Sequence, residues 1–252
     1  MAMQSSFPGA SGSTVDPAEV AKFSKLSDEW WDPRGKMAPL HKINPLRLGY
    51  IRDAACRKFE RNVRSLSCLS GLRILDIGCG AGLLCEPLTR LGAQVIGIDP
   101  SATNIAAARL HADKGHLSID YRCTSVEEMD VRERFDIVLA MEVVEHVTDV
   151  GLFVGRCAAM LKPGGMMVAS TLNRNWKSFA LAIVGAEYVL RWLPRGTHQW
   201  NKFVTPDELS RYLADHNLTI TEQAGVVYNP LADKWTISSD TDVNYMVVAE
   251  EV

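Results

Sequence analysis

The 252-residue sequence has neither an excess of positive charge nor an uninterrupted apolar stretch long enough to cross a membrane. Its 27 basic and 30 acidic side chains give a formal net charge of −3, so the chain lacks the global basic field by which many proteins attract nucleic acid. We therefore expect no nucleic-acid partner. The six cysteines include no pair with CxxC spacing, which argues against a zinc or dithiol redox site and indicates reduced thiols.

The N-terminal stretch lacks the features of a targeting segment. Residues 1–22 contain a single basic residue, Lys22, and no continuous apolar run, so neither a secretory signal nor an Arg-rich transit peptide fits. A cytoplasmic location is the default expectation. The glycine, serine and proline content of residues 1–22 predicts a flexible tail, and we assign residues 23–252 to one domain.

Apolar runs alternate with helix-forming stretches through the middle of the chain. The predicted strands are Leu72–Ile77, Gln94–Ile98, Ile119–Cys123, Phe135–Ala140 and Met166–Thr171. Leu83–Leu91 and Thr103–Lys114 have the composition of helices between them. This alternation predicts an α/β fold with a doubly wound, mostly parallel sheet that is covered on both faces.

The pattern changes after the fifth predicted strand. Residues 176–194 are dense in large apolar side chains and have the character of an insertion. Residues 205–208 read Thr-Pro-Asp-Glu, which is the pattern of an N-cap, a first-turn proline and a capping-box glutamate. Leu218–Val227 and Val243–Ala249 are predicted to close the sheet as an antiparallel C-terminal hairpin.

A glycine-rich turn and an aspartate follow the first two predicted strands. Gly78 and Gly80 belong to the turn, and Asp99 comes 21 residues after Gly78. Ligands of open α/β sheets bind at the carboxyl ends of the strands, where glycines admit a close approach and a carboxylate accepts bonds from ribose hydroxyls. The dinucleotide fingerprint GxGxxG requires glycine at position 83, where Leu83 stands, so NAD is disfavoured.

Glu142, Glu145 and His146 follow the fourth predicted strand. If a helix begins near Glu142, these side chains project from one face at i, i+3 and i+4. Two carboxylates and one imidazole suit Mg²⁺, Mn²⁺ or Zn²⁺, and a bound metal could lower the pKa of a catechol-like oxygen. His146 could instead be a general base, or the group could orient the backbone. The residues themselves leave these three roles open.

The glycine turn and the aspartate after the second predicted strand together resemble the motifs of a known superfamily. Asp76-x-Gly78-x-Gly80-x-Gly82, together with Gly97-Ile98-Asp99, is similar to the cofactor motifs of class I S-adenosylmethionine-dependent methyltransferases. Three further sets of residues narrow the resemblance to the ubiquinone-biosynthesis O-methyltransferase family: 30–32 with 40–47, 196–203, and 228–231 with 243–245. The resemblance runs from about Phe23 to the C-terminus and implies a Rossmann-like fold.

The resemblance also implies an activity and a set of site residues. That family methylates both the phenol and the catechol oxygens of polyprenylated ubiquinone precursors, using S-adenosylmethionine, and membership of a biosynthetic complex would be compatible with this role. By resemblance, cofactor contacts fall on Arg47, Gly78, Gly80, Asp99 and Met141. Divalent-metal ligation falls on the Glu142, Glu145 and His146 group. A guanidinium such as that of Arg47 can bind a cofactor carboxylate through a bidentate fork.

A polyprenyl acceptor would lie in a bilayer, and residues 176–194 are the candidate for reaching it. The stretch between Phe179 and Leu193 is too short and too charged to span a membrane, which needs about 20 apolar residues. Its aromatic and basic side chains suit the interface, which would make the protein peripheral on the inner membrane. The alternative is an amphipathic lid over the active site.

The sequence is also compatible with two other functions. The chain could methylate a small soluble phenol or carboxylate, in which case residues 176–194 would form a lid. It could also be a non-catalytic scaffold that binds S-adenosylmethionine, although the intact glutamate and histidine group argues against that.

Overall fold

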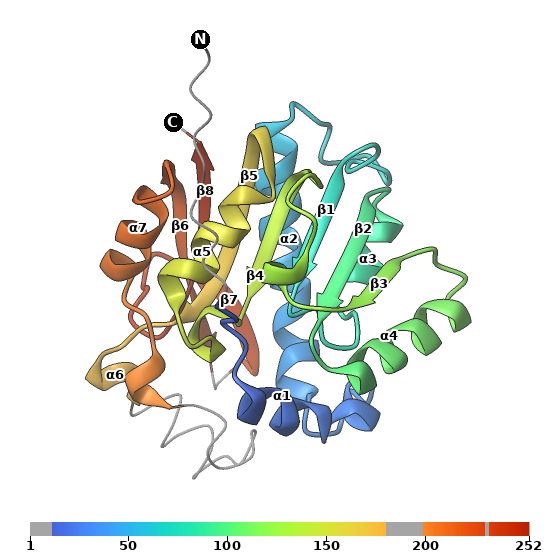
Figure 1. The fold of residues 1–252 in the computed structure, drawn as a ribbon, viewed down its shortest axis with the longest axis horizontal. Helices are drawn as coiled ribbons and strands as arrows, with labels where there is room; N and C mark the ends of the chain where they lie inside the picture. The colour runs from blue at the N-terminus through green and yellow to red at the C-terminus, as the bar shows by residue number, and fades with distance from the viewer. Residues whose placement is uncertain (1–11, 180–198, 230–231, 252) are drawn as a thin grey trace.

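A computed structural model describes residues 12–179, 199–229 and 232–251. Its sheet has eight strands in the order β3-β2-β1-β4-β5-β8-β6-β7 (Figure 1). The strands are β1 (Arg73–Ile77), β2 (Gln94–Asp99), β3 (Asp120–Cys123), β4 (Phe135–Met141), β5 (Leu161–Leu172), β6 (Leu218–Asn229), β7 (Lys234–Ser238) and β8 (Asn244–Glu251). β1 to β5 pair in parallel, whereas β8, β6 and β7 pair antiparallel.

Helices cover both faces of this sheet. They are α1 (Pro17–Ser24), α2 (Ala38–Lys58), α3 (Cys85–Arg90), α4 (Ala102–Lys114), α5 (Val150–Ala159), α6 (Trp176–Ser178) and α7 (Pro206–Ala214). α2, α3 and α4 contribute to the apolar cluster on one face, and α5 and α7 contribute to the cluster on the other. The predicted doubly wound α/β fold is therefore confirmed.

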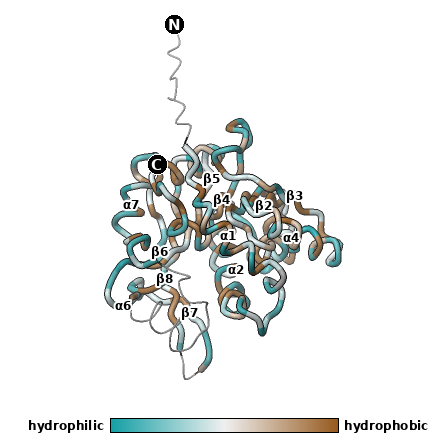
Figure 2. The backbone as a smooth tube through the Cα atoms, turned by 60° about the horizontal axis from the view of Figure 1, so that its bottom comes forward, coloured by the Kyte–Doolittle hydropathy of each residue, from teal (hydrophilic) through white to brown (hydrophobic). Residues whose placement is uncertain are grey.

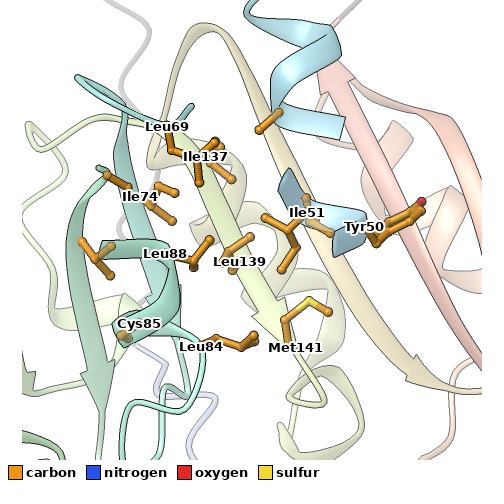
Figure 3. Packing of buried hydrophobic residues seen from close by; sticks show 14 of the residues in the cluster. Tyr50, Ile51, Leu69, Ile74, Leu84, Cys85, Leu88, Ile137, Leu139 and Met141 are labelled. Carbon is orange, nitrogen blue, oxygen red and sulfur yellow. The ribbon is translucent and has the colours of Figure 1, made fainter. Parts of the chain in front are cut away.

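Successive strand residues alternate between the two cores, because side chains of a strand point to opposite faces. On β1, Ile74 packs in the cluster with α2 and α3, whereas its neighbour Leu75 packs in the opposite one. Figure 3 shows Leu88 of α3 and Ile51 of α2 beside Leu139 of β4. The apolar segments concentrate along the central strands, with hydrophilic segments toward the outer helices and loops (Figure 2). Both layers hold the carboxyl ends of the strands in fixed positions.

The C-terminal strands differ in one respect from the predicted hairpin. β6 and β8 pair antiparallel as expected, but β7 forms within the intervening loop and pairs with the outer edge of β6. The predicted start of α7 is confirmed, because Thr205 caps the helix and Glu208 completes the capping box.

The order of strands reverses between β1 and β4, which is the switch point of a doubly wound sheet. The loops after β1 and β4 leave the sheet on either side of this point. Figure 1 shows α1 below the carboxyl ends of the parallel strands. The fold therefore places the glycine turn, the residues after Met141 and the N-terminal helix around one location.

Candidate active site

A cavity of about 580 Å³ lies at the carboxyl ends of the strands. Six of the eight residues predicted for the site line it: Arg47, Gly78, Asp99, Met141, Glu142 and His146. Gly80 and Glu145 lie outside this lining. The sequence motifs therefore converge on one cavity although they come from four separate segments of the chain.

The glycines of the turn have different neighbours. Gly78 has φ +67°, and a Cβ atom there would lie 2.6 Å from Val143 Cγ2 in the loop after β4. Gly80 has φ +54°, and its Cβ would meet the indole ring of Trp30 at 2.5 Å. Both positions need glycine because of the positive φ and the close approach. Gly78 borders the cavity, whereas Trp30 covers Gly80.

Asp99 ties the end of β2 to the glycine turn. Its Oδ2 accepts a hydrogen bond from the Gly80 N–H at 3.1 Å, and its Oδ1 accepts one from the Ser101 N–H at 2.8 Å. The Asn104 side-chain amide donates to Oδ1 at 3.3 Å. Burial raises the pKa of Asp99, while these bonds act in the opposite direction. A carboxylate has about four acceptor positions, so it retains capacity for ligand hydroxyls.

The buried Arg47 and the half-buried Glu142 form an ion pair in the wall of the cavity. The Arg47 Nη2 lies 2.7 Å from the Glu142 Oε1, and Arg47 is 3% exposed. The same Oε1 accepts bonds from Ser170 Oγ at 3.1 Å and Asn244 Nδ2 at 3.0 Å. Glu142 thereby joins donors from α2, β5 and β8.

The residues around the cavity suit a polar ligand with a carboxylate, a ribose and a base. Within the described part of the chain, several buried polar atoms of lining residues have no hydrogen-bond partner: Trp30 Nε1, Arg47 Nε, Asn104 Oδ1, Glu127 Oε2 and Asn244 Oδ1. Such groups are costly to leave unpaired, at about 1–3 kcal/mol each. Their concentration around one cavity fits the binding of S-adenosylmethionine.

Glu142, Glu145 and His146 do not share a helix face. Glu142 has φ +58°, and the chain then enters a short 3₁₀ helix, η3 (Val144–His146), in place of the expected α-helix. Glu145 is buried and its Oε2 accepts a bond from Thr171 Oγ1 at 2.7 Å. Burial and the neighbouring Glu142 raise the pKa of Glu145.

The three side chains consequently diverge. Glu142 points to Arg47 and Glu145 to Thr171, while His146 Nδ1 lies 3.0 Å from Glu19 Oε2. Among the described residues there is no cluster of three His, Cys, Asp or Glu side chains that could hold a metal ion. The residues as placed do not fit the predicted divalent metal.

The N-terminal segment contributes residues that the sequence did not indicate. The predicted boundary of the flexible tail at residue 22 falls inside α1, and Glu19, Val20 and Phe23 of this helix line the cavity. Burial raises the pKa of Glu19, but hydrogen bonds from His146 and Lys22 outweigh it and lower the pKa to about 2. No motif marks Glu19, because its partners lie far away in the sequence.

A further wall comes from the C-terminal strands. Val226 and Tyr228 of β6 and Trp235 of β7 line the cavity, and the rings of Tyr228 and Trp235 lie 5.2 Å apart. β7 lies at the opposite edge of the sheet from β2 and β3. The cavity therefore extends from the Asp99 region to an aromatic region on the antiparallel strands.

Comparisons with known proteins agree with this geometry. A family model described as a methyltransferase domain matches residues 48–223. A curated ubiquinone biosynthesis O-methyltransferase from Bradyrhizobium sp. strain ORS 278 is 80% identical over 252 residues, which is 100% of both chains. The protein of that name from Bradyrhizobium diazoefficiens is 84% identical over 239 residues, covering 95% of this chain and 94% of the relative.

The chain belongs to the ubiquinone biosynthesis O-methyltransferases. It is therefore an S-adenosylmethionine-dependent O-methyltransferase, as the motifs predicted. The methyltransferase also resembles in fold the solved magnesium protoporphyrin IX methyltransferase from Synechocystis PCC 6803 with bound S-adenosylmethionine. That match has a TM-score of 0.64 at 14% identity and covers 96% of this chain and 100% of the other.

Proposed function

We propose that this methyltransferase transfers methyl groups from S-adenosylmethionine to the phenol and catechol oxygens of polyprenylated ubiquinone precursors, in both O-methylation steps. The observation that carries the proposal is the full-length similarity to relatives named for ubiquinone biosynthesis. The cavity supports it, because a polar region around Asp99 is continuous with an aromatic wall at Trp235.

The cofactor is assigned to the polar region. The backbone of Gly78 borders the cavity, Gly80 donates to Asp99, and we assign Asp99 to the ribose hydroxyls of the cofactor. Met141 packs at the end of β4 on the same cavity. Arg47 faces the cavity with further donors besides the one that binds Glu142, and its planar fork suits the carboxylate of the amino-acid end.

The methyl acceptor is assigned to the space between His146 and the aromatic wall. The bound cofactor supplies a sulfonium methyl group, and its transfer to a phenolate cancels opposite charges, which a dry apolar site favours. His146, which lines the cavity, is assigned the role of accepting the phenol proton, because a neutral imidazole can act as a general base. The surrounding side chains align the reactants.

The metal hypothesis requires a different arrangement from the one observed. Glu142, Glu145 and His146 would have to leave Arg47, Thr171 and Glu19 to converge on one ion. Methyl transfer measured with chelator, and again after restoring Mg²⁺, Mn²⁺ or Zn²⁺, tests the hypothesis, since activity that disappears and returns would support metal ligation.

Access to a polyprenyl acceptor is assigned to the segment 176–194, of which residues 180–194 lie outside the described residues. At its start, Trp176 is 80% exposed and contacts Phe179 edge to face. No helix in the described ranges is both long and apolar enough to cross a membrane. We propose peripheral contact with the inner membrane from the cytoplasmic side. Replacing Tyr188 and Trp192 by serine should weaken liposome cosedimentation, and unchanged cosedimentation would contradict this assignment.

The decisive assay is transfer of a labelled methyl group to a prenylated phenol and, separately, to a prenylated catechol. Product with both acceptors supports the proposal. A short-chain soluble phenol that reacts equally well without lipid would favour the soluble-substrate function instead. Cofactor binding without transfer to any acceptor would favour a scaffold in a biosynthetic complex.

A further inference from the structure

The segment 12–31 crosses the loops that follow the first four strands. Trp31 Nε1 donates to the carbonyl of Ala81 after β1, at 3.0 Å. Ser24 and Ser101 hydroxyls lie 2.6 Å apart after β2. Two more contacts involve Thr14: its hydroxyl donates to Glu127 after β3, and its carbonyl accepts from the Thr148 N–H after β4. The segment therefore lies over the cavity and is joined to each loop that forms it.

One contact of the segment 12–31 involves His146, the residue proposed to accept the phenol proton. Glu19 Oε2 lies 3.0 Å from His146 Nδ1, and the two side chains are 9% and 15% exposed. Lys22 Nζ also lies 3.1 Å from this Oε2. Phe23, one turn along α1, packs edge to face on the imidazole with ring centroids 5.1 Å apart. α1 thus holds the His146 ring by a hydrogen bond and by packing.

This geometry selects one form of the imidazole. An ionised carboxylate accepts hydrogen bonds and cannot donate them, so the proton of the Glu19 contact belongs to His146 Nδ1. In the neutral ring, the basic nitrogen is then Nε2, on the other side of the ring. A carboxylate in this position also stabilises the positive charge that the ring gains when it accepts a proton.

We propose that Glu19 is a positioning residue of the active site: it fixes the orientation and tautomer of His146 so that Nε2 serves the methyl acceptor. The proposal rests on the proposed base role of His146. It assigns to the N-terminal segment a role in the chemistry in addition to covering the cavity. It also explains why a carboxylate is buried on an otherwise ordinary helix.

The competing explanation is that Glu19 merely keeps the segment docked. Lys202 provides a matched control, because its Nζ lies 2.9 Å from Asp16 Oδ2 and joins the same segment to the 3₁₀ helix η5 (Trp200–Lys202), away from His146. Lys202→Met therefore removes one attachment of the segment without touching the imidazole. Glu19→Ala removes the contact between the segment and the imidazole of His146.

The experiment compares Glu19→Ala, Lys202→Met, His146→Gln and the Glu19→Ala/His146→Gln double variant of the full chain. It measures kcat and KM for a prenylated catechol, the affinity for S-adenosylhomocysteine by calorimetry, and the circular dichroism spectrum. We expect Glu19→Ala to lower kcat by roughly 10- to 100-fold with cofactor-product affinity within about twofold of wild type. Lys202→Met should retain kcat. The double variant should be no slower than His146→Gln, because coupled residues are not additive.

The outcomes separate the two proposals. Equal effects of Glu19→Ala and Lys202→Met on kcat, or losses that multiply in the double variant, would overturn the positioning role while leaving the base role in place. Wild-type kcat in His146→Gln would overturn the base role, and the positioning role with it. A loss in Glu19→Ala that appears in the affinity for S-adenosylhomocysteine and not in kcat would show that the residue acts through docking alone.

Discussion

Arg47 and Glu142 form an ion pair in the wall of the cavity, with Nη2 of the arginine 2.7 Å from Oε1 of the glutamate. The pair joins α2 to the loop after β4, two segments that the sequence separates by almost a hundred residues. Ser170 and Asn244 donate to the same oxygen, so Glu142 Oε1 accepts two hydrogen bonds in addition to its ion pair with Arg47. Its position is explained by this network, which also sets the direction of the guanidinium.

Replacing Arg47 by methionine should therefore affect both folding and binding. The variant leaves the Glu142 charge with Ser170 and Asn244 but without its cation, and we expect the free energy of unfolding to fall by about 2–3 kcal/mol. Affinity for S-adenosylhomocysteine should fall at least about tenfold, because a charge-assisted carboxylate contact is lost. Urea unfolding and calorimetry measure the two effects.

The double variant Arg47→Met/Glu142→Gln distinguishes the contribution of Arg47 to stability from its contribution to cofactor binding. Neutralising Glu142 removes the unpaired charge, so stability should recover in part. Affinity for S-adenosylhomocysteine should not recover, because the double variant also lacks the Arg47 guanidinium. A double variant that regains both would show that Arg47 acts solely as the partner of Glu142.

Gly78→Ala should weaken cofactor binding more than backbone strain alone explains. The new Cβ would lie 2.6 Å from Val143 Cγ2 and displace Val143, the residue that follows Glu142 in the loop after β4. Gly71 is the matched control, since its φ is +80° and a Cβ there meets no described atom within 4 Å. Both variants should lose about 1 kcal/mol from the left-handed backbone. Equal affinities of the two for S-adenosylhomocysteine would contradict the assignment of Gly78.

The alternation of apolar strands and helices was enough to predict the parallel part of the sheet and the edge at which the candidate site lies. β1 and β2 bury side chains on both faces, so their apolar runs are visible locally, and the ends of these strands were marked by Gly78 and Asp99. β7 was missed because its exposed edge position gives it a mixed pattern, with Lys234 and Thr236 exposed.

The arrangement of the site was less accessible from the sequence. Spacing alone placed Glu142, Glu145 and His146 on one face, but the positive φ at Glu142 interrupts the helix and sends the three side chains to different partners. Those partners come from α1, α2 and β5, and pairing across such distances has no local signature. Glu19 was not predicted for the same reason: its partner His146 is distant in the sequence, and the composition of residues 1–22 suggested a flexible tail.

Trp235→Ala should weaken binding of the methyl acceptor and leave binding of the cofactor unchanged. The indole lines the end of the cavity farthest along the sheet from β2, so we expect the KM for a prenylated catechol to rise about tenfold from lost aromatic contact. Affinity for S-adenosylhomocysteine should stay unchanged. Ile237→Ala, on the same strand at a position 48% exposed, serves as the control. A similar rise in both variants would indicate a general weakening of β7.

Asp76 should make the ligand-free protein less stable as the pH rises toward neutrality. Burial raises its pKa to about 7, against a hydrogen bond from the Cys85 thiol that lowers it, and the charge of Asp99 raises it further. A raised pKa means that the folded state binds the proton more tightly than the unfolded state does. The stability from this group is therefore complete below pH 4, the unfolded value, and is lost as the pH approaches 7.

Asp76→Asn removes this ionisation while keeping an oxygen that can accept the Cys85 bond. Relative to wild type, the variant should gain stability between pH 5 and pH 8, by at least about 1 kcal/mol, because one unit of pKa corresponds to about 1.4 kcal/mol. Urea unfolding at the two pH values measures the change. Asp130→Asn is the control: the Arg132 side chain lowers the pKa of Asp130 to about 2, so its difference from wild type should be constant over this range. A constant difference for Asp76→Asn as well would show that Asp76 is charged in the fold throughout, with its burial offset by neighbouring donors.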